Sequence, residues 1–432
     1  MRLKMTEMKQ GIAGALNRLR IRWWTFFYDR CLVGFPWFWP ARPLGVPAMV
    51  AARRIVRQHF GSDYHPAYRA LAQVLAAIAW PPAVLIHLWQ IRYVRGPEAV
   101  PIKHIPGALW AAMRHNVLPG EYYAYALWQS NHKANIDDYL YSREGPRLFK
   151  LLNRPLRPNP IDDKLEFHEM CKAHALPSPE ILAAYSPTGQ LLEFKSGQPP
   201  NRDLFVKPRF GAGSDGAEHF HWRHVVFESD RGCRVSPEEL GVYLTTRART
   251  ENRTLLVQPA LLNHPMLRIS ANANLATARI VTGLTTDGAV IPIFGFFSYF
   301  TRRDEISDRH IAMIDLATGR LMPSQSFSEA EAANDLIVNG SDNTRMLPEW
   351  NSVLRHTKVA HQVCSNFVFI GWDTVFTVQG VMLLEGNINW GAADYQRLRG
   401  EPLGHTKFAD ILALRLRDLE AVPKGVEYSG SR

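Results

Sequence analysis

The chain has 432 residues, of which 46% are hydrophobic and 21% are charged. This is the composition of a globular protein long enough for about two or three domains, and it excludes wholesale disorder. Four widely separated cysteines form no C-x-x-C pair, which excludes a zinc ribbon or redox motif and favours a reducing cytoplasm over a disulfide-bonded scaffold.

The formal net charge of +10 is concentrated at the N-terminal end. Residues 1–120 contain 16 Lys and Arg against 4 Asp and Glu, and they hold seven of the twelve tryptophans. Basic and aromatic side chains together suit an anionic membrane surface or nucleic acid. Nucleic acid is less favoured, because the aromatic residues cluster with Leu, Val and Pro. We expect residues 1–120 to be a basic, aromatic-rich helical region, with residues 1–100 making a peripheral membrane contact.

The most apolar segment is Leu71–Trp89, which has 19 residues and no formal charge. A membrane-spanning helix needs about 20 such residues. Gln73, His87 and the Pro81-Pro82 pair argue against a span, since proline removes a backbone donor and breaks helices. Three interpretations stay open: a buried hairpin or core helix, a segment at the membrane interface, and a true span.

Residues 121–160 read as a helical linker that ends in a proline-rich stretch. Next, Asp162-Asp163 predict the start of a helix, because acidic residues at the first turn interact favourably with the helix dipole. Short apolar segments then alternate with turns, and Asp287-Gly288 and Gln379-Gly380 mark two hairpins. The expected strands are Leu204–Lys207, Val225–Glu228, Leu255–Leu262, Ala278–Leu284, Ala289–Phe297, Thr374–Val378 and Val381–Glu385, and the expected helices are Ser236–Thr245 and Glu349–Asn366.

Lys207 ends one of these strands and is followed at once by a loop with three glycines, Gly211, Gly213 and Gly216. Glycine lets backbone N–H groups approach an anion closely, and the lysine adds a positive charge beside them. No Gly-Lys-Ser/Thr follows, so the loop is not a Walker motif. It is either a phosphate-binding loop or a plain hairpin loop.

Asp373 is followed by Glu385 and Asn387, twelve and fourteen residues further on. Alternation along the second strand of the hairpin places Glu385 and Asn387 on one face, which Asp373 can reach from just before the first strand. Carboxylate and amide oxygens suit Mg²⁺. The alternative is a polar edge hairpin.

Arg279 lies inside the apolar stretch Ala278–Val281. Its forked set of donors suits a phosphate or acyl phosphate, and the alternative is an internal salt bridge.

Three histidines, His219, His221 and His224, form an H-x-H-x-x-H pattern whose spacing would suit a metal ion on a strand. No carboxylate that would support such a site is evident beside them. We therefore expect packed or solvated histidines here.

Taken in order, these features resemble the ATP-grasp superfamily from about Asn153 to about Leu416. Within it, the chain is most similar to the sugar-transfer-associated ATP-grasp family, related to alpha-L-glutamate ligases. Each matching motif is weak evidence alone, but the occurrence of all of them in the family's order over more than half of the chain is specific for the family. The matching pieces are Asp163-Lys164 with Leu176–Pro179, Phe205–Pro208 with the glycine loop, Leu256–Pro259 with Asn263–Pro265, Thr277–Thr282, Ile314–Gly319 and Leu384–Gly391.

The resemblance implies an α/β (α+β) ATP-grasp fold, in which two mixed or antiparallel sheet subdomains clamp the nucleotide. An N-terminal helical region precedes this fold in the sequence. The implied domains are residues 1–120, the linker 121–160 and an ATP-grasp domain at 161–425. That domain would divide into a lysine and glycine-loop part at 161–257 and a metal- and phosphate-binding part at 258–425.

The resemblance also implies roles for individual residues. Arg279 and Lys207 would act catalytically by neutralising the transferred phosphoryl group. Asp373, Glu385 and Asn387 would hold one or two Mg²⁺. The residues implied to bind ATP are Lys164, Lys207, Gly211, Gly213, Ser214, Gly216 and Gln258.

The implied activity is that of an ATP-dependent ligase. ATP would convert a small or glycan-linked carboxylate to an acyl phosphate, from which an amine or thiol displaces phosphate. The family points to cell-envelope or surface-polysaccharide modification in the cytoplasm or at the inner membrane face. A kinase-like phosphotransferase and a non-catalytic nucleotide-binding, membrane-associated protein are the alternatives.

The chain departs from the family pattern at three places. Ala276 stands where Asn is usual, and Asn389-Trp390-Gly391 stands where the family has Pro-Gly. The glycine pair that usually precedes the Asp-x-x-Thr-Gly stretch is replaced near Asp308-Arg309-His310. These departures affect the acceptor side more than the nucleotide side.

Overall fold

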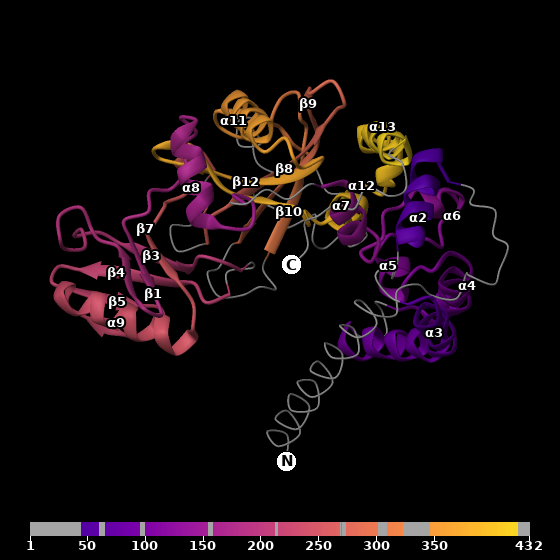
Figure 1. Cartoon of the computed structure of the whole chain (residues 1–432), viewed down its shortest axis with the longest axis horizontal. Coiled ribbons are helices and arrows are strands. Elements are labelled where there is room, and N and C mark those ends of the chain that lie inside the picture. Colours follow the sequence, from indigo (N-terminus) through magenta and orange to yellow (C-terminus); the bar gives the residue numbers. More distant parts are fainter. Residues whose placement is uncertain are drawn as a thin grey trace, which may run out of the picture. The chain divides into compact units, whose positions relative to one another are not determined.

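The computed structural model describes residues 45–59, 65–95, 100–153, 159–211, 215–267, 269, 274–300, 309–322 and 346–421. The chain divides into two compact units, one formed by residues 149–391 and the other by residues 1–148 together with 392–432. Figure 1 shows the elements of each unit coloured along the chain.

The unit of residues 149–391 is built on two antiparallel sheets (Figure 1). In its described part, sheet A has the strand order β2-β1-β7-β3-β4-β5-β6, and sheet B has the order β11-β10-β9-β8-β12-β13. The strands of sheet A are β1 (Ala183–Ser186), β2 (Gly189–Leu192), β3 (Leu204–Pro208), β4 (Glu218–Arg223), β5 (Val226–Ser229), β6 (Arg234–Val235) and β7 (Leu255–Pro259). The strands of sheet B are β8 (Thr277–Leu284), β9 (Val290–Phe300), β10 (Arg309–Ile314), β11 (Leu321–Met322), β12 (Phe369–Thr377) and β13 (Gly380–Asn387).

Helix α9 (Pro237–Glu251) covers one face of sheet A (Figure 1). It begins with a reciprocal cap, in which the Ser236 hydroxyl accepts from the Glu239 N–H and the Glu239 carboxylate accepts from the Ser236 N–H. Leu240 and Leu244 then pack on Leu204, Phe220 and other buried residues of the sheet. The expected helix is thus confirmed, and it is longer than Ser236–Thr245.

Helix α11 (Trp350–Val363) packs on sheet B through Trp350 and Val353, which contact Ile280 of β8 and Phe376 of β12. The expected helix at Glu349–Asn366 is confirmed within a few residues. A short 3-10 turn, η4 (Pro265–Leu267), precedes β8.

Helix α8 (Lys164–Ala173) packs against both sheets. Phe167 contributes to the core that includes Trp372 and Leu383 of sheet B, while Leu165 packs beside Leu256 of sheet A. The N-terminus of α8 therefore lies where the two sheets approach each other.

The other unit is helical in its described part. In the expected helical linker at 121–160, short helices alternate with turns, one of which places Ala126 in the left-handed region at φ 47°. The elements are α2 (Pro47–His59), α3 (Pro66–Arg95), η2 (Ile102–His104), α4 (Ile105–His115), α5 (Pro119–Ala124), α6 (Ser130–Ala134), η3 (Ile136–Asp138), α12 (Ala392–Arg399), η7 (Leu403–His405) and α13 (Lys407–Ala421). Helix α7 (Gly145–Leu152) includes the boundary between the two units at residues 148 and 149.

The apolar segment Leu71–Trp89 lies within α3, which continues through Pro81-Pro82. The proline pair does not break the helix, which agrees with the open interpretation of a core helix. Trp80 and Val84 flank the prolines and are buried in a core with α4 and α5, and the Trp80 indole N–H donates to the Ala112 carbonyl at 3.1 Å. This packing holds the helix together where the prolines remove backbone donors. Within the described ranges, no helix is long and apolar enough to cross a membrane.

Candidate functional site

Three charged side chains form a row across neighbouring strands of sheet B. Arg279 of β8 lies opposite Asp373 of β12, and Asp373 lies opposite Glu385 of β13. The Arg279 Nε and Nη2 atoms donate to the two oxygens of Asp373 at 2.6 and 2.5 Å. Asp373 is therefore in the middle of a strand and not before it, because β12 extends back to Phe369 through the buried Ile370 and Trp372.

A bulge in β13 turns Glu385 toward this row. Leu383 lies opposite Thr374 and Glu385 lies opposite Asp373, so Leu384 is an extra residue. Strict alternation would place Glu385 on the buried face with Leu383. The bulge instead places Gly386 on that face, where an added Cβ would lie 2.7 Å from Ile161 Cδ1.

Asn387 joins the row from the same face of β13. Its Nδ2 atom lies 3.2 Å from Asp373 Oδ2 and 3.5 Å from Glu385 Oε1. The Asp373 and Glu385 side chains are 13% and 25% exposed, so a ligand can reach them. Two carboxylates and an amide within hydrogen-bond reach of one another form a hard oxygen donor set that fits Mg²⁺. We call these three residues the oxygen cluster.

Two lysines face the oxygen cluster. Lys164 is the first residue of α8, and its Nζ lies 3.8 Å from Glu385 Oε2 and donates to the Gly211 carbonyl at 2.6 Å. Lys207 follows the buried Val206 on β3. Burial lowers the pKa of Lys207 to about 8; the Glu385 carboxylate opposes this shift and the Lys164 charge adds to it. An arriving anion would restore a full charge on Lys207.

The glycine loop is anchored at its start by a two-point ion pair. Arg209 Nε and Nη2 donate to Asp163 at 2.8 and 2.6 Å. The same carboxylate caps α8 by accepting from the Leu165 N–H at 3.0 Å. Although burial acts in the opposite direction, these donors hold the pKa of Asp163 below its usual range. The loop start and the helix bearing Lys164 are thereby tied together.

The end of the loop is anchored by a buried ion pair. Arg247 Nη1 donates to Glu218 Oε2 at 2.7 Å, and Nη2 of the same side chain donates to the Gly216 carbonyl. Gly211 and Gly216 have φ of 114° and 75°, which glycine tolerates far better than other residues. Gly213 and Ser214 lie outside the described residues.

Gln258 is buried in β7 opposite Phe205. Its Nε2 atom donates to the Pro179 carbonyl at 3.3 Å. By alternation it shares a face of sheet A with Leu256, whose cross-strand partner is Lys207. A contact with adenine stays a prediction.

Two of the three departures from the family pattern, at Trp390 and Ala276, have structural explanations, whereas Asp308 lies outside the described residues. Trp390 is buried over Gly371, where an added Cβ would lie 2.3 Å from Trp390 Cβ, and its ring packs 4.9 Å from that of Phe149. Ala276 is buried in the sheet B core, and its N–H donates to Asn263 Oδ1 at 2.8 Å. Neither departure removes a member of the charged row.

Sequence reasoning missed the anchors of the glycine loop. Asp163 was noted as a first-turn acid, but nothing in the sequence pairs it with Arg209, 46 residues away. Glu218 and Arg247 lie on a strand and a helix whose packing alone brings them together.

Several solved structures are similar to this chain at low sequence identity. One is a D-alanyl-alanine synthetase A from Vibrio cholerae O1 biovar eltor, with 13% identity over 60% of this chain and 65% of that chain, and a TM-score of 0.32. Another is a D-alanine–D-alanine ligase from Helicobacter pylori, with 12% identity over 61% of each chain and a TM-score of 0.33. An N5-carboxyaminoimidazole synthetase from Staphylococcus aureus matches at 8% identity over 58% of this chain and 50% of that chain, with a TM-score of 0.28.

In each of these three comparisons the matched region spans less than two thirds of the other chain. The likenesses are too distant to bear on activity. No curated protein sequence matches this chain.

A family model described as sugar-transfer associated ATP-grasp matches residues 145–408. These residues include both sheets and all of the charged row. Because the match covers more than half of the sequence, this chain belongs to the sugar-transfer associated ATP-grasp family.

Proposed function

We propose that this protein is an ATP- and Mg²⁺-dependent ligase that joins a carboxylate to an amine or a thiol. One observation carries the proposal: the Arg279–Asp373–Glu385 row of sheet B is met by Lys164 from the start of α8. A cationic fork, an oxygen donor set and a lysine thus converge within one unit. Such an arrangement suits the binding and transfer of a phosphoryl group.

The proposed reaction has two displacement steps. An oxygen of the carboxylate substrate attacks the γ-phosphorus of ATP, the bond from that phosphorus to the β,γ-bridging oxygen breaks, and ADP leaves. The amine nitrogen then attacks the carbonyl carbon of the acyl phosphate, the bond from that carbon to the phosphate oxygen breaks, and inorganic phosphate leaves. The amine loses one proton. Catalysis of this kind depends mainly on positioning and charge neutralisation.

Each residue of the site has a role in this proposal. Asp373 fixes the orientation of the Arg279 fork, which would bind the transferred group. Lys207 and Lys164 would bind the phosphates of the nucleotide. Bound at the oxygen cluster, Mg²⁺ would neutralise phosphate charge.

The proposal is tested by phosphate release from ATP and Mg²⁺, with amino acids and uronic acids as carboxylates and with amines as acceptors. Release that requires both a carboxylate and an amine supports the ligase. A stable phosphorylated product formed without an amine would instead indicate a kinase-like phosphotransferase. Arg279→Ala should abolish the release, and Arg223→Ala should not, because Arg223 is an exposed side chain of β4.

We further propose that the helical unit contacts an anionic membrane surface through α3. Eight large apolar side chains of α3 are between 46% and 68% exposed and recur at steps of one, three, four and seven residues, which places them on one side of the helix. The opposite side is buried through Trp80, Val84 and Leu88. The exposed residues, which we call the α3 stripe, are Leu71, Val74, Leu75, Ile78, Leu85, Ile86, Trp89 and Tyr93.

The net positive charge of this region favours an anionic lipid surface as the partner that the α3 stripe contacts. Helix α3 contains three arginines and no acidic residue, and residues 1–120 have 12 more basic than acidic residues. Ile102 and Lys103, just beyond α3, are both exposed. Apolar side chains entering the acyl boundary beside basic side chains at the headgroups are typical of an interfacial helix.

Sedimentation of the full chain with vesicles tests this contact. The wild type should partition onto phosphatidylglycerol vesicles more strongly than onto phosphatidylcholine vesicles, and salt should weaken the binding. A triple change, Leu75→Gln, Ile78→Gln and Trp89→Gln, should abolish partitioning, while Val242→Gln on the exposed side of α9 should have no effect. Equal partitioning by the triple variant, or a dimer that buries α3 in place of lipid binding, would refute the contact.

A further inference from the structure

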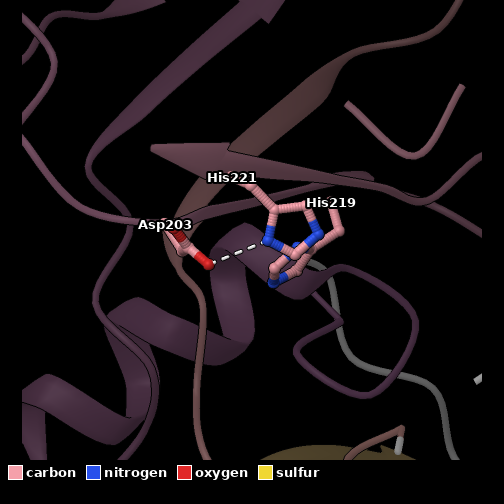
Figure 2. Close-up of side chains that lie close together, drawn as sticks. All are labelled: Asp203, His219 and His221. Atoms are coloured by element: carbon pink, nitrogen blue, oxygen red, sulfur yellow. Dashed lines mark hydrogen bonds and ion pairs between the residues drawn. The ribbon is translucent and has the colours of Figure 1, made fainter. Parts of the chain in front are cut away.

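A second cluster of metal-binding side chains lies on sheet A, apart from the oxygen cluster. Alternation along β4 places His219 and His221 on the same face of the sheet. Asp203 lies immediately before β3, and Asp230 lies immediately after β5. Figure 2 shows the Asp203 carboxylate directed at the His221 ring, with the His219 ring beside it.

The sequence pattern suggested no carboxylate near these histidines, and the structure corrects this. Strand pairing brings Asp203 Oδ2 to 3.0 Å from His221 Nδ1 and Asp230 Oδ1 to 3.2 Å from His221 Nε2. The third histidine of the pattern, His224, is exposed in the turn between β4 and β5 and has φ of 62°. The metal-binding groups therefore come from different strands and not from the H-x-H-x-x-H spacing.

The ring nitrogens of the two histidines face each other. His219 Nδ1 lies 3.1 Å from His221 Nε2, and the ring centroids are 4.2 Å apart. Two nitrogen ligands of a tetrahedral zinc ion, each bound at about 2.0–2.1 Å, are about 3.3–3.4 Å apart. His221 Nε2 thus already lies at about this spacing from His219 Nδ1 and, separately, from the Asp230 oxygen at 3.2 Å.

The contact between Asp203 and His221 decides which nitrogen would bind the cation. When Asp203 accepts a hydrogen bond from Nδ1–H, the neutral ring keeps its lone pair on Nε2. The same lone pair faces the carboxylate oxygen of Asp230, an acceptor, at 3.2 Å and His219 Nδ1 at 3.1 Å. A cation at this point would accept the lone pairs of both ring nitrogens, whereas without a cation the His219 Nδ1–H would donate to His221 Nε2.

We propose that His219 Nδ1, His221 Nε2 and Asp230 bind a divalent cation of the zinc type, with Asp203 orienting His221. Two imidazoles and a carboxylate favour Zn²⁺ or Co²⁺ over the harder Mg²⁺. A carboxylate behind a metal-bound histidine is the usual support for such a ligand. The His221, Asp203 and Asp230 side chains are 22%, 43% and 41% exposed, so water can complete the coordination.

This zinc-type site is separate from the oxygen cluster of sheet B. Asp203 precedes Lys207 by four residues along β3, which is about 13 Å at about 3.3 Å per residue. Both residues lie on the face of sheet A opposite α9, since Leu204 and Val206 face that helix. A cation bound here would not compete with Mg²⁺ for the same ligands.

Titration of the full chain with Co²⁺ tests the site. The protein is made without a polyhistidine tag, freed of metal with a chelator, and measured in excess Mg²⁺ to occupy hard-oxygen sites. We expect one Co²⁺ per chain, with the visible absorption of a tetrahedral complex that Zn²⁺ displaces. His221→Ala and Asp230→Asn should abolish the absorption, and Asp203→Asn should weaken binding about 10–100-fold.

His224→Ala is the matched control and should bind Co²⁺ like the wild type, because His224 is exposed in the turn between β4 and β5. Circular dichroism establishes whether each variant is folded. If His221→Ala does not fold, Asp230→Asn still tests the site, because Asp230 is more exposed than His221. No Co²⁺ binding by the wild type would overturn the proposal and leave these side chains as a hydrogen-bonded cluster. Binding that survives in both ligand variants would overturn it equally.

Discussion

Arg279 and Asp373 lie directly opposite each other on β8 and β12 and form a two-point ion pair, with N–O distances of 2.6 and 2.5 Å. Their side chains are 24% and 13% exposed. At this burial each charge depends on the other, because removing one leaves its partner uncompensated. The same ion pair therefore stabilises sheet B and orients the Arg279 guanidinium, which we propose binds the transferred phosphoryl group.

Replacing Arg279 by Ala should lower the free energy of unfolding by about 1–3 kcal/mol, since Asp373 loses its counter-charge. Arg279→Lys should restore part of the stability but not the phosphate release, because lysine lacks the planar fork. Urea unfolding and the phosphate-release assay measure the two effects. Arg223→Ala, at an exposed position, should change neither. Full activity in Arg279→Lys would show that the fork is not required.

The lowered pKa of Lys207 predicts an unusual dependence of stability on pH. The pKa is about 8 in the folded chain and 10.5 for an unperturbed lysine. Between these values the unfolded chain binds a proton that the folded chain does not, so this group makes stability rise with pH. Below a pH of about 8 Lys207 is charged in the folded chain, so burial of this charge lowers the free energy of unfolding by its full amount.

Lys207→Met should therefore raise the free energy of unfolding of the nucleotide-free protein by about 1–3 kcal/mol at neutral pH. The difference from the wild type should shrink between pH 8 and 10.5. The same variant should weaken ATP binding by at least about tenfold, because a phosphate contact is lost. Chemical unfolding at several pH values tests this, with Lys172→Met at an exposed position of α8 as the control. A difference that is constant over this pH range would contradict the lowered pKa.

Gly371→Ala should destabilise the protein by about 2–4 kcal/mol, because the added methyl group would overlap Trp390, at 2.3 Å from its Cβ. Gly241→Ala is the matched control. It lies in α9 with its nearest new contact at 3.5 Å, so it should be neutral or slightly stabilising. Thermal unfolding compares the two variants, and equal melting temperatures would show that Trp390 can move away.

Much of the fold follows from the sequence because its signals are local. The two hairpins are predicted by their Gly-containing turns, and α9 is predicted by its capping sequence. Asp373 was placed one residue outside its strand, since the burial that extends β12 depends on α8 and α11. The continuous α3 is a similar case, because tertiary packing outweighs the two prolines.

The geometry of the candidate site depends on contacts between distant residues. The shared face of Glu385 and Asn387 was predicted correctly, but the bulge at Leu384 that turns both away from the core is a feature of strand pairing. The histidine cluster shows the same limit. The spacing of His219 and His221 is visible in the sequence, whereas Asp203 and Asp230 join them through β3 and β5.

The ion pair behind the glycine loop predicts a further effect on stability. Glu218→Gln removes the more buried of the two carboxylates that pair with Arg247, while Glu251 stays 2.8 Å from its Nε, so the change should cost about 1–3 kcal/mol. Because Arg247 also holds the Gly216 carbonyl, ATP affinity should fall as well. Glu228→Gln on β5, whose side chain is 44% exposed, should leave both quantities within error. Unfolding and nucleotide titration of the two variants make the comparison.

The central claim is that Glu385 and the residues beside it form a nucleotide site that depends on Mg²⁺. Calorimetry of ATP binding to the wild type and to Glu385→Ala, each with and without Mg²⁺, tests it most directly. Glu193→Ala, at an exposed position after β2, is the control. The account predicts Mg²⁺-dependent binding that is retained in Glu193→Ala and lost in Glu385→Ala. Absence of ATP binding by the folded wild type, or equal binding by Glu385→Ala, would contradict it.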